Sequence, residues 1–431
     1  MDNDLRAILA AALEAADPGA AVRRFLRVEG GAIVVGERRI AARRVVVLAV
    51  GKAAASMARA THEILRDRID GSLVVTKKGY DVNTPRVFDT IVAGHPVPDE
   101  GSLEAARRVT ALAVSLGEGD LLLALLSGGA SALLADPAGD ITLADLSALS
   151  RDLLRSGAAI GEMNAVRKHL STLKGGGLAR LAAPAAVAAL LLSDVVGDDP
   201  STIGSGPTVP DPTTLADVAA ALRRYAITPP PRVARYLDSA PETMKPGDAV
   251  FARVTNTIIG GGRLSAAAAA TKARELGYTP LILSTLITGA AREAAGLHAA
   301  IVREALETGH PASPPCALIS GGETTVVVRG AGLGGPNQEF ALALAVELAG
   351  VPRWAALAVD TDGSDGPTDA AGGLVTGATA AAIHAAGVDP VVALDANDAY
   401  PALRAAGALL TTGPTGTNVN DVRVVLIGCP P

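Results

Sequence analysis

One pattern recurs along this chain of 431 residues and limits what it can fold into. A short apolar run leads into a turn of small residues and then into a helical segment, at residues 45–60, 121–134, 256–273 and 316–325. Such turns leave backbone N–H groups unpaired at the start of a helix, where the helix dipole concentrates positive charge. Phosphates and carboxylates bind at such places. The repetition therefore predicts an α/β fold with a site for several anionic groups.

The composition agrees with buried parallel strands covered by helices. Hydrophobic residues make up 49% of the chain but aromatic residues only 2%, so Ala, Leu and Val supply the core. The longest uninterrupted apolar run, 181–192, contains Pro184 and falls short of the roughly 20 residues that cross a membrane. We therefore expect no membrane partner.

The charge and the cysteine content exclude several classes of protein. The net charge is −6 and no basic run occurs, so we expect no nucleic-acid partner. Cys316 and Cys429 are too few for a disulfide framework or a zinc motif. The acidic N-terminal segment lacks the features of a signal peptide, and we expect a cytoplasmic protein. The sequence leaves open whether it forms a homodimer.

The length predicts two domains. We place the boundary in the Pro- and Gly-interrupted segment 239–250, giving domains of residues 1–243 and 244–431, and a break at 310–316 is the alternative. Strand-like runs alternate with helical stretches, as in a parallel sheet covered on both faces. We expect strands at residues 44–50, 72–76, 88–93, 121–127, 187–193, 256–260, 281–284, 316–320, 324–328, 355–360 and 422–428.

Two strand ends are candidate anion sites. Lys52 follows the apolar run 44–50 and can bring its ammonium group to an anion held by the helix that begins there, although it could equally be a solvated lysine. The turn 127–131 offers two glycines for close backbone approach and two hydroxyl groups, and 320–324 nearly repeats it. Either could be an ordinary turn. No Walker A motif is present.

Segment 163–179 is predicted to be one helix that ends at a glycine triplet. Its polar residues recur at spacings of three, four and seven, so they share a face, which could clamp a carboxylate or simply contact water. They are Asn164, Arg167, Lys168, Ser171 and Lys174.

Aspartates mark two further strand ends. Asp194 lies where ligands of open α/β sheets bind, at the carboxyl end of an apolar run. The segment 358–373 contains Asp360, Asp362, Asp365 and Asp369. Carboxylates this close repel one another unless a cation neutralises them, which suits Mg²⁺ carried by a nucleotide, although some are turn or capping residues.

A possible dinucleotide motif competes with this interpretation. Gly330, Gly332 and Gly335 spell G-x-G-x-x-G between a strand-like run and a helix, but no acidic residue follows at the expected spacing of about 20 positions. His95 is the one histidine in a loop that looks functional. A Thr- and Asn-rich loop that includes Asn420 precedes the last strand.

Taken together, these segments resemble the class II glycerate 2-kinases, which carry a C-terminal MOFRL region and were once labelled hydroxypyruvate reductases. The matching blocks run in order from residue 49 to 422 and include LLSGGASALL, MNAVRKHLSTLKGGGLA, LLSDVVGDDPSTIGSGPTVPD and DTDGSDGPTDAAG. In one departure, Pro336 stands where some relatives have an arginine.

The resemblance implies a Rossmann-like α/β/α N-terminal domain with a mostly parallel sheet. It also implies a smaller mixed α/β domain with the MOFRL region at about 312–422, and an active site in the cleft between them. The implied reaction phosphorylates the 2-hydroxyl of D-glycerate with ATP and Mg²⁺.

The implied roles are as follows. Lys52, Asp194 and Asp360 are catalytic; Ser127, Gly128, Gly129, Ser131, Gly321, Gly322, Glu323 and Asn337 bind ATP; Lys52, His95, Arg167, Lys174 and Asn420 bind substrate; Asp194 and Asp362 bind metal. The alternatives are an NAD(P)H-dependent hydroxypyruvate reductase and a non-catalytic sensor of nucleotides or sugar acids.

Overall fold

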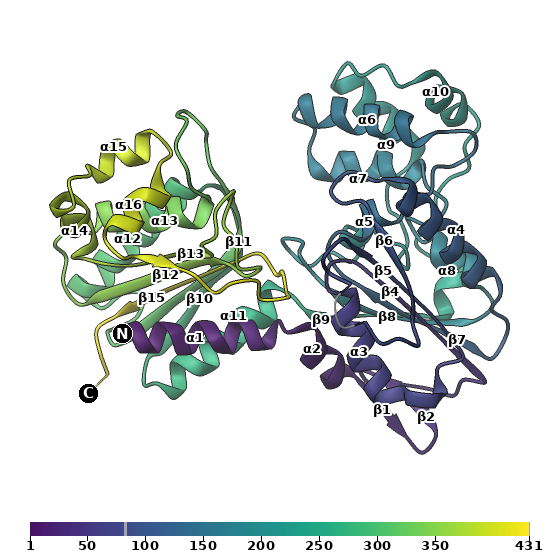
Figure 1. Ribbon diagram of the computed structural model, residues 1–431, viewed down its shortest axis with the longest axis horizontal. Coiled ribbons are helices and arrows are strands. Elements are labelled where there is room, and N and C mark those ends of the chain that lie inside the picture. The colour runs from purple at the N-terminus through teal and green to yellow at the C-terminus, as the bar shows by residue number, and fades with distance from the viewer. Residues whose placement is uncertain (82–83, 431) are drawn as a thin grey trace. The chain divides into compact units, whose positions relative to one another are not determined.

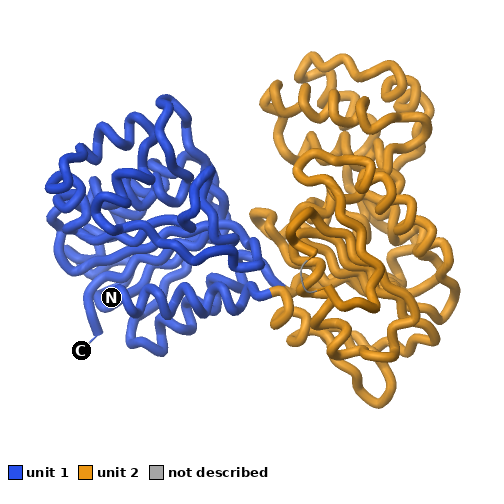
Figure 2. The backbone as a smooth tube through the Cα atoms, in the orientation of Figure 1, with its two compact units in different colours: residues 1–17, 260–431 blue, residues 18–259 orange. Residues whose placement is uncertain are grey.

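The structure is a computed structural model that describes residues 1–81 and 84–430 (Figure 1). The chain forms two compact units (Figure 2). Unit 1 consists of residues 1–17 and 260–431, and unit 2 of residues 18–259. The chain passes between them twice, whereas we expected one boundary at 243/244, a point that lies inside unit 2.

Unit 2 is built on a six-stranded sheet whose strands follow one another in the order β6-β5-β4-β7-β8-β9. The strands β4 to β8 run parallel. The order reverses between β4 and β7, and the carboxyl ends of two such strands form the usual ligand site of an open α/β sheet. The strands are β4 (Arg44–Val50), β5 (Gly71–Lys77), β6 (Asp89–Ala93), β7 (Asp120–Leu126), β8 (Ala186–Leu192) and β9 (Val254–Gly260).

The central strands are apolar because both faces are covered. Every residue of β7 is buried, as are six of the seven residues of β4. Helices pack on this sheet, including α3 (Ala54–Leu65), α4 (Glu100–Val114) and α8 (Gly177–Ala182). The Rossmann-like arrangement expected for this half of the chain is therefore confirmed.

Two smaller parts complete unit 2. One is α2 (Pro18–Phe25) with an antiparallel sheet of β1 (Leu26–Glu29), β2 (Ala32–Val35) and β3 (Arg38–Ile40). The other is a helical layer whose apolar residues form a core of their own. Its helices are α6 (Leu143–Arg155), α7 (Ile160–His169), α9 (Leu215–Arg224) and α10 (Pro231–Leu237). The short helix α5 (Ala130–Leu133) belongs to the core of the six-stranded sheet instead. Short 3₁₀ helices are η1 (Arg66–Arg68), η2 (Ile203–Ser205) and η3 (Ala249–Arg253).

Unit 1 holds a mixed six-stranded sheet in the order β10-β11-β15-β12-β13-β14. Only β10 and β11 pair in parallel. The strands are β10 (Thr279–Ala290), β11 (Cys316–Thr325), β12 (Trp354–Asp360), β13 (Gly372–Thr376), β14 (Leu409–Leu410) and β15 (Asp421–Ile427).

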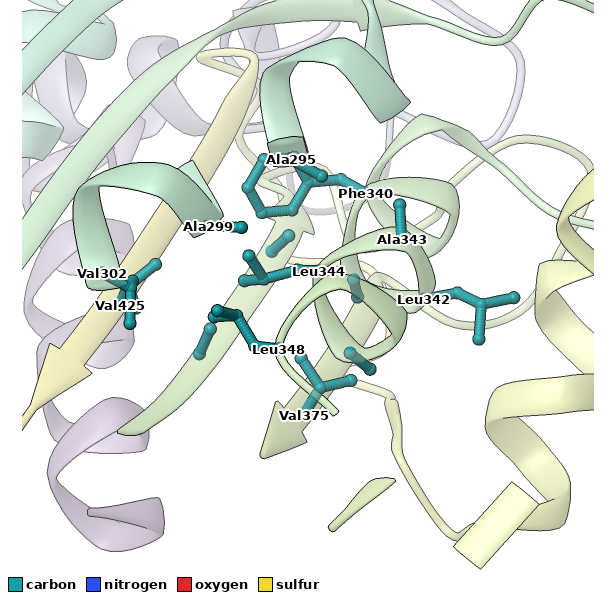
Figure 3. Close-up of a cluster of buried hydrophobic side chains, with 14 of the residues drawn as sticks. Ala295, Ala299, Val302, Phe340, Leu342, Ala343, Leu344, Leu348, Val375 and Val425 are labelled. Atoms are coloured by element: carbon teal, nitrogen blue, oxygen red, sulfur yellow. The ribbon is translucent and has the colours of Figure 1, made fainter. Parts of the chain in front are cut away.

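Helices cover both faces of this sheet. α1 (Asp2–Ala15) and α11 (Gly262–Glu275) lie along one face, where Leu5 and Ile8 enter the core (Figure 1). α12 (Ala291–Thr308) and α13 (Pro336–Glu347) cover the other face, with Phe340 and Leu344 at the centre of the cluster in Figure 3. Three short helices follow: α14 (Thr379–Ala385), α15 (Pro390–Asp395) and α16 (Ala399–Ala405).

Most predicted strands are confirmed to within about two residues, and one is wrong. Residues 316–325 form a single strand, so the turn and second strand expected at 320–328 do not occur. The predicted helix 163–179 is also wrong, because α7 ends at His169 and Gly176 instead precedes α8. The sequence reading missed β1, β2, β3, β13 and β14. Within the described residues, no helix has the length and apolarity needed to cross a membrane.

Candidate functional site

The first group of candidate residues lies at the carboxyl ends of the unit 2 strands, around the point where the strand order reverses. Gly51 and Lys52 follow β4, and Ser127 follows β7. The two turns are bonded together: Lys52 N–H donates to the Gly128 carbonyl at 2.9 Å. A Cβ atom on Gly51 would overlap with Ser127, so glycine is needed for this close approach.

Ser127 has a structural role in this arrangement. Its side chain is buried, and its Oγ accepts a hydrogen bond from Ala53 N–H at 3.1 Å. The hydroxyl that was expected to bind nucleotide therefore helps to join the two turns. Ser131 is also engaged, because its hydroxyl lies 2.9 Å from that of Ser205 in η2.

Three predicted residues from separate strand ends meet around Gly128 and Gly129. A Cβ atom on Gly128 would overlap with the Asp194 carboxylate. A Cβ atom on Gly129 would lie 3.0 Å from Cδ2 of His95 and 3.5 Å from Cγ of Lys52. The structure thus brings Lys52, His95 and Asp194 to one glycine turn. We call these five residues the strand-end site.

The charges of the strand-end site influence one another. Burial raises the pKa of Asp194, and the nearby Lys52 ammonium group lowers it. Burial lowers the pKa of His95, and the ammonium groups of Lys52 and Lys77 lower it further. His95 is therefore neutral at pH 7. Within the described part of the chain, Lys52 has no carboxylate within 4 Å, so its charge is available to an anionic ligand.

The cations predicted to line one helix face have different surroundings in the structure. Lys174 lies beyond the end of α7, and its Nζ donates to Asp136 Oδ1 at 2.9 Å and to the Leu134 carbonyl at 2.7 Å. Lys168 is buried and paired with Asp211 at 3.3 Å. Both lysines are therefore bound internally. Lys174 also lines a pocket of about 240 Å³ with His169, Arg180 and other residues, none of which belongs to the strand-end site.

Arg167 differs from these two lysines. Burial lowers the pKa of its guanidinium group, and among the described residues no carboxylate lies within 4 Å of it. Its helix α7 packs against η2, which is bonded to the turn of the strand-end site through Ser205 and Ser131. Arg167 thus remains the candidate for a substrate carboxylate on this helix.

The second group of candidate residues lies in unit 1, at the end of β12. Asp360 is its last residue and pairs across the sheet with Asp421, the first residue of β15. Burial and the negative charges of Asp362, Asp421 and Asp365 raise the pKa of Asp360 to about 7. We call Asp360, Asp362, Asp365 and Asp421 the carboxylate cluster.

Neighbouring groups hold this cluster in place. Asp365 accepts hydrogen bonds from the backbone N–H groups of Asn337 at 3.0 Å and Gln338 at 2.8 Å, in the first turn of α13. Burial raises its pKa to about 6 against the effect of these bonds. Asp362 Oδ1 accepts from the N–H of Ser364 at 2.9 Å, which shapes the turn that carries it.

Asn337 and Arg423 connect the cluster to the core of unit 1. Asn337 Nδ2 donates to Asp421 Oδ1 at 2.6 Å and to Asp365 Oδ1 at 3.2 Å, so the side chain predicted to bind ATP joins two carboxylates. Arg423 is fully buried and bonded to Asp421. The sequence reading did not single out Arg423, because nothing local marks an arginine inside an apolar strand as the partner of a distant aspartate.

The remaining predicted residues of unit 1 lie within a strand or shape a turn. Gly321 and Gly322 lie inside β11, where a Cβ atom on Gly322 would overlap with the backbone of Ile287. They form no turn at a helix start. Glu323 is an exposed residue of the same strand. Asn420 has φ of 66°, and its carbonyl accepts from the Thr361 hydroxyl at 2.7 Å, so it fixes the turn beside Asp360.

The glycines of the possible dinucleotide motif also serve packing. A Cβ atom on Gly330 would overlap with the backbone of Ala396, and one on Gly335 would overlap with Asp365. Gly332 N–H donates to the Ala396 carbonyl at 3.0 Å. The close approach that these glycines permit is therefore made to the protein's own backbone.

Comparisons with known proteins identify the family of this chain. Residues 4–238 match a family described as a domain of unknown function, DUF4147, and residues 316–421 match the MOFRL family. A protein of Agrobacterium vitis named putative hydroxypyruvate reductase is 45% identical over 98% of this chain and 94% of its own length. The D-glycerate 2-kinase of Thermotoga maritima is 44% identical over 89% of this chain and 91% of its own.

A solved structure extends the likeness to three dimensions. The crystal structure of the glycerate kinase of Thermotoga maritima matches with a TM-score of 0.89 and 42% identity, and the match covers 97% of each chain. The fold, both family matches and the curated relatives agree, and the chain belongs to the class II glycerate kinase family.

Proposed function

We propose that this enzyme transfers the terminal phosphoryl group of ATP to the 2-hydroxyl of D-glycerate, giving 2-phosphoglycerate and ADP. The observation that carries the proposal is the strand-end site, where Lys52 and a glycine turn lie at the point where the strand order reverses. The 44% identity to a D-glycerate 2-kinase supports the choice of acceptor and position.

Phosphoryl transfer requires mainly positioning and neutralisation of charge. Lys52 has an ammonium group free to stabilise the charge that develops on the transferred group. The backbone N–H groups of the turn at Gly128 and Gly129 would hold phosphate oxygens. His95 is neutral and can donate or accept a hydrogen bond from the substrate. Arg167 would hold the glycerate carboxylate, since Lys174 is occupied by Asp136.

The acceptor hydroxyl needs a group that orients it or takes its proton. Asp360 suits this role because its pKa of about 7 lets it exist in both protonation states near neutral pH. Asp194 is the other candidate, with a raised pKa and a position beside Gly128. Of these candidates, Asp194 belongs to unit 2, as does Lys52, and Asp360 belongs to unit 1.

Mg²⁺ is the metal that the family and the reaction imply. Among the described residues, no three His, Cys, Asp or Glu side chains form a ready-made metal site. Carboxylate oxygens are ligands that Mg²⁺ prefers, and it is commonly held through one or two of them together with the phosphates of a nucleotide. Asp362 and Asp194 would supply those carboxylates, and the metal would neutralise phosphate charge.

Two further properties complete the proposal. We place the enzyme in the cytoplasm, in agreement with two free cysteines, of which Cys316 is buried and Cys429 exposed. A homodimer is proposed for its assembly, and sedimentation of the full chain tests it.

The reaction is tested by incubating the full chain with ATP, Mg²⁺ and D-glycerate and following the product by phosphorus NMR. A resonance of 2-phosphoglycerate supports the proposal, and one of 3-phosphoglycerate contradicts the position of attack. Oxidation of NADH by hydroxypyruvate without ATP would establish the reductase instead. Binding of ATP and glycerate without release of ADP would establish a sensor.

A further inference from the structure

The sheet of unit 2 places one more lysine at the edge that carries the strand-end site. Lys77 is the last residue of β5, which lies between β4 and β6. It pairs across the sheet with Ala93, two residues before His95. Val75, two residues earlier on β5, pairs with Val50 at the end of β4. Lys77 therefore ends its strand between the turns that carry Lys52 and His95.

Two contacts fix the end of β5. The Thr76 hydroxyl donates to the Gly51 carbonyl at 3.0 Å, and Gly51 N–H donates to the Val75 carbonyl at 3.1 Å. These bonds join the last residues of β5 to the turn that carries Lys52. The ammonium group of Lys77 lies 4.1 Å from the centre of the Tyr80 ring, a cation–π contact that restricts its long side chain.

In the described part of the chain, the ammonium group of Lys77 forms no ion pair. Among the described residues, no carboxylate lies within 4 Å of its ammonium group, and the same holds for Lys52. Both ammonium groups nevertheless act on one imidazole, since each lowers the pKa of His95. Two like charges at the same edge of a sheet repel each other, and an anion between them relieves this repulsion.

We propose that Lys77, held by the ring of Tyr80, is a second phosphate-binding cation of the strand-end site. With Lys52 it binds the phosphoryl group that is transferred. A lysine ammonium group is a compact point charge, which suits phosphate oxygens that change position during transfer. This inference rests on the proposed kinase reaction. Beyond that reaction, we infer that Lys77 recognises the transferred phosphoryl group, which is present in ATP and in 2-phosphoglycerate but absent from ADP and D-glycerate.

The test compares four ligands by calorimetry on the full chain with Mg²⁺: a non-hydrolysable ATP analogue, ADP, 2-phosphoglycerate and D-glycerate. In Lys77→Ala we expect the dissociation constants of the ATP analogue and of 2-phosphoglycerate to rise about tenfold or more, as for the loss of a hydrogen bond to a charged group. Those of ADP and D-glycerate should change less than about twofold. Tyr80→Leu should show the same pattern more weakly, because the ammonium group stays but is less restricted.

Lys78→Ala is the matched control, since Lys78 is the neighbouring lysine and its side chain is exposed. It should leave all four dissociation constants unchanged. Equal weakening of ADP and the ATP analogue in Lys77→Ala, with 2-phosphoglycerate unaffected, would assign Lys77 to the other nucleotide phosphates and overturn the inference. Weakening of D-glycerate would assign it to the carboxylate and overturn it too, as would four unchanged constants.

Turnover of the wild type is measured beside these titrations. A wild type that forms no 2-phosphoglycerate contradicts the proposed function. An active wild type with unchanged binding in Lys77→Ala contradicts only the role of Lys77. Thermal unfolding of each variant confirms that it is folded.

Discussion

The strand-end site of unit 2 and the carboxylate cluster of unit 1 are built by opposite means. In unit 2, glycines allow three strand ends to approach closely, and ammonium groups remain without carboxylate partners within 4 Å among the described residues. In unit 1, aspartates crowd together and side-chain hydrogen bonds hold them in place. The first arrangement attracts an anion, and the second requires a cation or a proton.

One chain thus supplies both kinds of group that phosphoryl transfer requires: cations for the phosphates and carboxylates for a metal ion or a proton. Free cations suit the phosphate groups, and carboxylates suit a metal ion or a hydroxyl proton. The two groups lie in separate units of the chain. The following variants test two expectations. The ammonium groups of unit 2 should contribute to catalysis, and the crowded carboxylates of unit 1 should lower its stability unless they are neutralised.

The largest effect is expected from Lys52→Ala. The variant removes the ammonium group of Lys52, a residue whose Cγ packs against Gly129, without breaking an ion pair of the described structure. The protein should therefore stay folded while kcat falls about 100-fold or more. Steady-state kinetics and thermal unfolding measure both quantities, with Lys78→Ala as the control. A kcat within about threefold of the wild type would remove Lys52 from the mechanism.

Arg423→Met should act on stability. The change leaves the buried Asp421 without its cation, and breaking a buried pair in this way costs about 3–5 kcal/mol. The single tryptophan, Trp354, is buried in β12 of unit 1, so its fluorescence during urea unfolding reports on this unit. Arg274→Met changes an exposed arginine of α11 and should shift stability by less than about 0.5 kcal/mol. Equal stability of the two variants would show that Arg423 does not support the cluster.

A smaller effect concerns Asp360 and pH. Its pKa is about 7 in the folded protein and about 4 in an unfolded chain, so the folded state keeps a proton that the unfolded state has lost. The free energy of unfolding should therefore fall as the pH rises from about 4 to about 7. Asp360→Asn stays uncharged, so its free energy of unfolding relative to the wild type should rise by about 3 kcal/mol between pH 5 and pH 8, at about 1.4 kcal/mol per unit up to the folded-state pKa. Urea unfolding at pH 5 and pH 8, followed by Trp354, measures the difference.

Asp389 provides the control of opposite sign. Backbone N–H groups of Val392 and Val391 lower its pKa at the start of α15, so its contribution is present at neutral pH and is lost as the pH falls. Asp389→Asn should therefore lose stability relative to the wild type at pH 8. If both aspartate variants shifted in the same direction with pH, the raised pKa of Asp360 would be contradicted.

The strand-end site could be predicted from the sequence because its logic is local. A parallel strand buried on both faces reads as a continuous apolar run, and its carboxyl end lies at the binding edge of the sheet. Lys52, Gly128 and Asp194 each follow such a run, and the structure brings them together. Lys77 follows an equally good strand, but only the sheet order shows that this strand lies beside β4.

The two wrong predictions, the turn and second strand at 320–328 and the helix at 163–179, depend on contacts with residues distant in sequence. The letters SGG occur at 127–129 and at 320–322, yet the second copy lies inside a strand because β10 and β15 pair with it on both sides. The helix predicted for 163–179 stops at His169, where the chain turns so that Ser171 can pair with Pro137 and Lys174 can reach Asp136. Those partners are distant in sequence, so no local pattern could reveal them.

The N-terminal helix α1 packs in unit 1, although all of unit 2 separates it from the rest of that unit in sequence. During synthesis α1 leaves the ribosome before α11 and β15, so the apolar side chains of Leu5 and Ile8 lack their packing partners until those elements follow. Unit 2 is synthesised completely before residues 260–431 of unit 1 are made. Folding in the cell should thus begin with unit 2 and end when α1 packs on α11.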